Sequence, residues 1–211
     1  MPLKGLRRLW LGEAGSAPPA WIKALWLEML SMTDEQVIAA TRHWLEKAVI
    51  GLNLCPFAKA VYVKSQVRLV VSQARHADDL LEELDSELDR LVNTPAGELD
   101  TTLLIHPTLF DDFLDFNDFM EIAEGVLDEH ELEGVVQLAS FHPKFQFDGT
   151  EADDIGNFTN RAPFAMIHLL REESIERAVA SFPHAEAIFE ENIRTLEKLG
   201  HPGWQALSVG S

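Results

Sequence analysis

The chain has 211 residues, of which 46% are hydrophobic and 25% are charged, a composition typical of one globular domain. Its 35 acidic and 17 basic residues give a formal net charge of -18. This charge argues against nucleic-acid binding, which depends on Lys and Arg neutralising phosphates, and against docking on anionic membranes. Cys55 is the only cysteine, which excludes an intrachain disulfide and favours a reducing, cytoplasmic location.

Residues 1–31 differ in composition from the rest of the chain. They carry four basic and two acidic residues, and the run Gly15-Ser16-Ala17-Pro18-Pro19 interrupts any long element. We interpret residues 1–31 as a loosely attached extension, such as an over-long choice of start codon would add. Residues 32–211 then form a single α/β domain.

A helix is expected to begin at Thr33. Thr33-Asp34-Glu35-Gln36 is a capping box, in which the side chains of the first and last residues bond the free backbone amides of a first helical turn. Apolar residues then recur at helical spacing, and Pro56 disfavours helical geometry at Cys55. We therefore expect this helix to end around residues 51–56 and a short helix to follow over 57–63.

Strands and helices alternate along the remaining chain. Apolar runs predict strands over 68–72, 101–105, 135–141 and 165–170, and helical spacing predicts helices over 78–91 and 116–127, the second capped by Asn117. The carboxylates of 78–91, Glu87 among them, are expected to form the solvated face of this helix. A short helix should begin at Ser174. A last one should run from Pro183 to Gly200 and bury Ile188, Phe189, Ile193 and Leu196.

The order of these elements predicts the sheet. Two successive strand–helix–strand units imply parallel pairing of the first three strands, whereas the fourth arrives without a helix and should run antiparallel. The expected fold is therefore α/β, with a small mixed, mostly parallel four-stranded sheet and helices packed on it.

Two histidines follow predicted strands directly, in Ile105-His106-Pro107 and Phe141-His142-Pro143. Ligands of parallel sheets bind beyond the carboxyl ends of the strands, and imidazole suits proton transfer near pH 7. His142 is therefore a candidate general acid/base and His106 a candidate substrate-binding residue. The alternative is that each histidine ends its strand by bonding a nearby carbonyl.

A polar loop after His142 adds further candidates. Arg161 could clamp a substrate carboxylate or phosphate, with Asn157 and Asn160 beside it, or it could pair with nearby aspartates. Four loop carboxylates could join His142 at a cation, although we favour a solvated acidic loop as their explanation. They are Asp148, Glu151, Asp153 and Asp154.

Cys55 and His168 each allow two interpretations. Cys55 could be a nucleophile or a small buried apolar residue, and a helix end before or after it would shift the pKa of its thiol in opposite directions. His168 lies within an apolar strand, where a core histidine with satisfied hydrogen bonds is expected.

Three strings of the sequence together resemble a bacterial family, domain of unknown function 1415. They run from Ala48 to Ala58, from Ser140 to Phe147, and from Asn160 through Pro163-Phe164 to Arg171. The resemblance covers about residues 33–199, leaves 1–31 outside, and contains Cys55, His142 and Arg161. It implies a grouping and no particular reaction or cofactor.

These observations support three hypotheses. The first is a small cytoplasmic enzyme acting on an anionic metabolite, in which His142 and Arg161 share a pocket with Cys55. The second is a metal-binding protein that uses His142 and the loop carboxylates. The third is a non-catalytic interaction module with an acidic face.

Overall fold

The computed structural model describes residues 32–181 and 187–210, and the chain divides into two compact units, Met1–Gln36 and Val37–Ser211. The predicted extension over 1–31 and the predicted helix start at Pro183 lie outside the described residues. Within those residues, no helix combines the length and the hydrophobicity that a membrane crossing requires.

The first described helix, α3 (Asp34–Trp44), begins at the predicted capping box. The amide of Thr33 donates to Oε1 of Gln36 over 2.9 Å, and the amide of Gln36 donates to Oγ1 of Thr33 over 3.3 Å. The helix widens into the π-helical stretch η1 (Leu45–Val49), and the short helix α4 (Ala58–Val63) follows.

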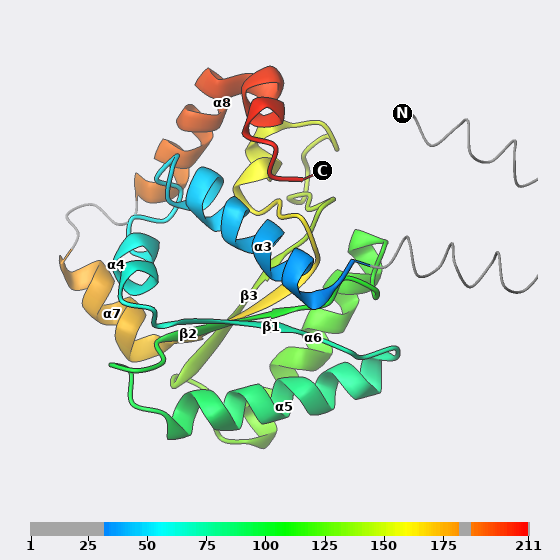
Figure 1. The fold of residues 1–211 in the computed structure, drawn as a ribbon, viewed down its shortest axis with the longest axis vertical. Coiled ribbons are helices and arrows are strands. Elements are labelled where there is room, and N and C mark those ends of the chain that lie inside the picture. Colours follow the sequence, from blue (N-terminus) through cyan, green and yellow to red (C-terminus); the bar gives the residue numbers. More distant parts are fainter. Residues whose placement is uncertain (1–31, 182–186, 211) are drawn as a thin grey trace, which may run out of the picture. The chain divides into compact units, whose positions relative to one another are not determined.

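The later elements follow the predicted order with two local corrections (Figure 1). The cap of α6 is Asp112, whose carboxylate accepts from the amide of Leu114, and Asn117 lies inside the helix. Helix α8 bends at Gly200 (φ 63°) and continues to Leu207, while Phe189 remains 56% exposed. The elements are β1 (Val67–Val71), α5 (Ala77–Asn93), β2 (Thr101–Ile105), α6 (Phe113–Glu129), β3 (Val136–Phe141), η2 (Ile155–Thr159), β4 (Met166–Arg171), α7 (Glu172–Ser181) and α8 (Ile188–Leu207).

The four-stranded sheet has the order β1-β2-β4-β3 and is mixed, not mostly parallel. Strand β1 pairs parallel with β2, whereas β4 pairs antiparallel with both β2 and β3. The antiparallel fourth strand was predicted correctly, but the direct pairing of the second and third strands was wrong. The chain returns after β3 and inserts β4 between them, which leaves β3 at the edge.

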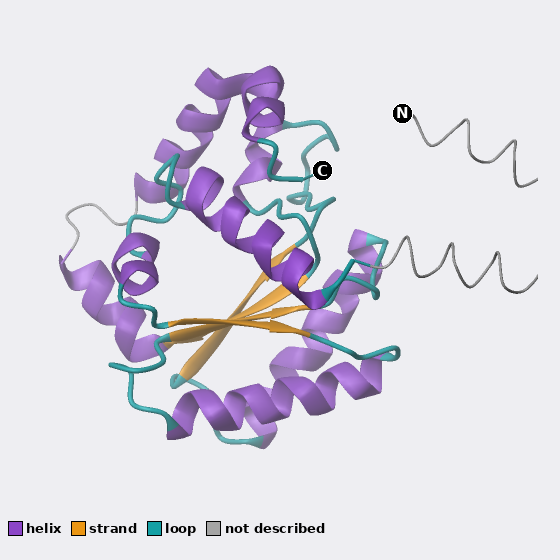
Figure 2. Ribbon diagram, viewed as in Figure 1, coloured by secondary structure: helices purple, strands orange, loops and turns teal. Residues whose placement is uncertain are grey.

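Helices cover both faces of the sheet (Figure 2). On one face, Leu104, Ile167 and Leu169 pack with helices α5 and α6 in the first core. On the other, Leu103, Ile105 and Met166 pack in the second core with residues from α3, η1 and α8. Because successive strand residues point to opposite faces, each residue of the sheet belongs to one side or the other.

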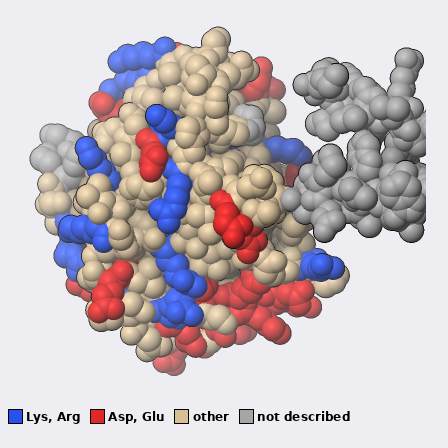
Figure 3. Space-filling model, in the orientation of Figure 1, with Lys and Arg blue, Asp and Glu red and all other residues tan. Residues whose placement is uncertain are grey.

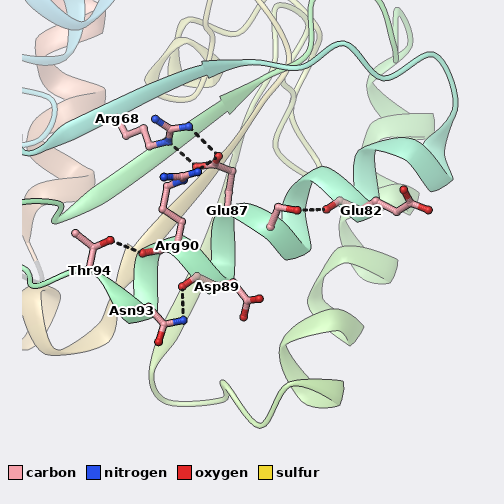
Figure 4. Close-up of polar contacts among 8 residues, drawn as sticks. Arg68, Glu82, Glu87, Asp89, Arg90, Asn93 and Thr94 are labelled. Atoms are coloured by element: carbon pink, nitrogen blue, oxygen red, sulfur yellow. Dashed lines mark hydrogen bonds and ion pairs between the residues drawn. The ribbon is translucent and has the colours of Figure 1, made fainter.

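A buried ion pair ties the edge strand β1 to helix α5 (Figure 4). The expectation that Glu87 faces solvent was wrong: it is 6% exposed, and Arg68 donates to its carboxylate from Nε over 2.7 Å and from a terminal nitrogen over 3.0 Å. Arg90 lies 3.6 Å from the same carboxylate. The other side of α5 faces solvent, and Figure 3 shows Asp and Glu gathered there, while Lys and Arg form a band over α3 and β1.

Candidate functional site

A pocket of about 1060 Å³ lies on the sheet face that carries the second core. Its floor comes from all four strands, and its walls come from η1, α4, α7 and the turn at Cys55. A volume of this size suits a small-molecule ligand. Most of the lining is apolar, and its polar side chains include those of Cys55, Thr101 and His168.

The alternation of side chains along the strands decides which predicted residues can reach this pocket. On β3, Gln137, Ala139 and Phe141 line it, so His142, one residue further, turns to the opposite face. On β2, Thr101 and Leu103 line the pocket, and His106 likewise turns away.

His168 points from β4 into the pocket and keeps one nitrogen free. The hydroxyl of Thr101 donates its single hydrogen to the carbonyl oxygen of Leu169 over 2.6 Å, so it accepts from Nε2–H of His168 over 2.7 Å. The lone pair is then on Nδ1, which has no hydrogen-bond partner among the described residues. Burial lowers the pKa of His168 to about 4, so the imidazole is neutral at pH 7.

Aromatic rings form the wall beside His168. The ring of Phe141 lies 5.9 Å from the imidazole and meets Trp44 edge-on at 5.1 Å. Trp44 donates from Nε1 to the backbone oxygen of Arg161 over 2.9 Å. This bond connects the wall of the pocket to the loop that follows β3.

Cys55 also lines the pocket, where it is half-buried. Burial raises its pKa, while the backbone amides of Phe57 and Ala58 act in the opposite direction with smaller effect. Desolvation therefore outweighs the helix-end effects that the sequence left open. The thiol remains protonated at neutral pH, which disfavours nucleophilic attack.

His142 is bonded to the backbone through both ring nitrogens. The amide of Lys144 donates to Nδ1 over 2.9 Å, so the proton is on Nε2, which donates to the carbonyl oxygen of Phe110 over 2.8 Å. Phe110 has a left-handed backbone (φ 59°), a conformation unfavourable for a bulky residue. His142 is 1% exposed, and burial lowers its pKa. Its geometry thus matches the expected alternative, a histidine that bonds a nearby carbonyl.

His106 lies in the same aromatic cluster as His142, which includes Phe110 and Phe116. The His106 ring is 1% exposed, and its centroid lies 5.4 Å from that of Phe110 and 5.1 Å from that of Phe116. Burial lowers its pKa to about 4, and the neighbouring His142 adds a smaller lowering effect. Both histidines are therefore neutral at pH 7.

The remaining predicted site residues organise the loop between β3 and β4. Arg161 donates from Nε to the carbonyl of Phe145 over 3.2 Å and lies 4.2 Å from the ring of Phe158. Asn157 is buried and accepts from the amide of Phe147 over 2.9 Å. Asn160 donates to the carbonyl of Ser140 over 3.3 Å. Neither Arg161 nor His142 lines the pocket.

The loop carboxylates do not assemble a cation site. Asp148, Glu151 and Asp153 are exposed, and the carboxylate of Asp154 accepts from the amide of Gly156 over 2.7 Å at the start of η2. Across residues 32–181 and 187–210, no group of three or more His, Cys, Asp or Glu side chains could hold a metal ion.

The fold and the pocket define an α/β protein with a ligand-sized cavity on one face of a mixed sheet. The chain belongs to the family described as protein of unknown function (DUF1415), which matches residues 36–206. Comparisons with curated proteins and with solved structures found no match.

Proposed function

We propose that the chain binds a small, largely apolar molecule in the pocket between the sheet and helices α4 and α7. The observation that carries this proposal is the lining itself: an apolar cavity of about 1060 Å³ into which His168 presents a neutral imidazole. A large apolar pocket with a few placed polar groups is typical of a ligand site.

His168 supplies orientation in this proposal. Its unpaired Nδ1 can accept a hydrogen bond from an O–H or N–H group of the ligand. With a pKa of about 4, the imidazole is too weak a base for efficient proton abstraction near pH 7. The thiol of Cys55 stays protonated. We therefore favour binding over catalysis at this site.

The enzyme hypothesis from the sequence assigned proton transfer to His142 and anion binding to Arg161. Both nitrogens of His142 already bond backbone groups, and the guanidinium of Arg161 bonds backbone carbonyls. These contacts support a role in shaping the loop that bonds Trp44 in the pocket wall. The cytoplasmic location and the bacterial source suggested by the sequence remain part of this proposal.

Filling the pocket tests the proposal. Ala178 on α7 lines the pocket, whereas Ala180 on the same helix is exposed and outside the lining. N-phenyl-1-naphthylamine, a neutral apolar dye whose fluorescence rises in apolar surroundings, serves as the probe. We expect the dye to bind the wild type and Ala180→Trp, and Ala178→Trp to abolish binding.

Both variants add one tryptophan to the same helix, so the comparison isolates the position of the new side chain. Circular dichroism and melting curves verify that both fold. Equal dye binding by the two variants, or no dye binding by the wild type, would refute the proposed site.

A further inference from the structure

On the basis of the proposed function, we infer that the ligand is an amphipathic anion. Its apolar body occupies the pocket, and its acidic group, such as a carboxylate, lies against Lys64. The inference comes from the distribution of charge around one edge of the pocket.

The sheet topology brings the cations of the pocket to one edge. Val67, Thr101, Leu170 and Gln137 are register neighbours across all four strands, and all four line the pocket. Lys64 caps α4 just before β1, and Arg177 lies on α7 just after β4. The start of β1 lies in register with the end of β4. Lys64, just before β1, and Arg177, just after β4, therefore lie on segments that join the sheet at the same side of the pocket.

Lys64 is the cation available to a ligand. Its ammonium has no ion-pair or hydrogen-bond partner among the described residues, and its side chain is exposed. Arg171 is occupied by backbone carbonyls, including that of Leu99 at 3.2 Å. Arg177 pairs with Glu173 and donates to Ser174 over 2.9 Å.

The carboxylate in this lining does not neutralise Lys64. Asp100 accepts from the hydroxyl of Ser174 over 2.6 Å, and Glu173 pairs with Arg177, so two carboxylates stand against three cations, Lys64, Arg171 and Arg177. A local excess of positive charge stands out in a chain with a formal net charge of -18. An apolar floor with a cationic edge is complementary to a molecule that combines an apolar body with an acidic group.

Two dyes that differ by a single acidic group test the inference. Anilinonaphthalene-8-sulfonate has the same ring system as N-phenyl-1-naphthylamine with a sulfonate added. Lys64→Met removes the unpaired cation. Lys59→Met is the matched control, because Lys59 is exposed on the same helix but outside the pocket lining, and the change in net charge is identical.

We expect Lys64→Met to weaken binding of the sulfonate dye about fivefold, the scale of one partly solvated ion pair. It should leave binding of the neutral dye unchanged, and Lys59→Met should change neither. Unchanged sulfonate binding by Lys64→Met, or an equal loss for both dyes, would overturn the inference. Either of those outcomes would overturn only the assignment of the acidic group, because the tryptophan variants test the binding site separately. A wild type that binds neither dye would contradict both proposals.

Discussion

Replacing His106 with leucine should make the fold less sensitive to acid. The imidazole is 1% exposed, and burial lowers its pKa to about 4, whereas an unfolded chain leaves a histidine near about 6.5. The unfolded state therefore binds this proton more readily than the folded state. The stabilisation is present above about pH 6.5 and is lost as the pH falls through about 4.

The size of the effect follows from these two pKa values. Between pH 7 and pH 5, protonation of the unfolded state should remove about 2 kcal/mol of unfolding free energy, approaching roughly 3 kcal/mol at lower pH. Other groups titrate in the same range, so the comparison must be made between variants. A variant without a titrating group at position 106 should lose about 2 kcal/mol less unfolding free energy than the wild type between pH 7 and pH 5.

Urea denaturation at pH 7 and pH 5 measures this difference. His106→Leu and His106→Gln both remove the titrating group, one with an apolar and one with a polar side chain, so a shared reduction in pH sensitivity comes from titration and not from packing. If both variants lose as much stability as the wild type between the two pH values, the argument from burial is refuted.

Three further changes test other parts of the fold. Arg68→Ala should lower the unfolding free energy by about 2 kcal/mol, because Glu87 remains buried without its bidentate partner. Urea denaturation measures this loss. An equal loss of unfolding free energy in the double variant Glu87→Leu, Arg68→Leu would contradict the explanation. His142→Ala should cost about 3 kcal/mol through the lost ring and its two backbone bonds; a change below about 0.5 kcal/mol would instead fit an exposed functional group. Removing residues 1–31 should lower the melting temperature by less than about 5 °C, and a larger drop in a thermal melt would show that the segment belongs to the fold.

Local features were predictable because their causes lie within a few residues. The capping box at Thr33 determines the start of α3, and β2 was predicted over the residues it occupies. The misplaced cap at Asn117 shows the limit of this reasoning. The turn before α6 places Asp112 at the N-cap of the helix, where its side chain accepts from the amide of Leu114.

The candidate site could not be predicted from the sequence, because it depends on the pairing of strands that are distant in the chain. Its chemistry depends on which face of the sheet each side chain occupies, and Phe141 and His142 occupy opposite faces although they are neighbours. His168 and its partner Thr101 are 67 residues apart, so the free nitrogen of His168 could not be foreseen. The polar residues within otherwise apolar strands, Thr101 and Gln137, were the available signal for a pocket floor.

The central position of β4 also has a consequence for folding. Among residues 32–181 and 187–210, strand β3 pairs only with β4, so residues 136–141 lack this strand partner until residues 166–171 have been synthesised. Until then the chain holds a parallel two-stranded pair and an unpaired apolar strand, an arrangement prone to aggregation. Closing the sheet late, by inserting a strand into its middle, adds non-local contacts of the kind that slow folding.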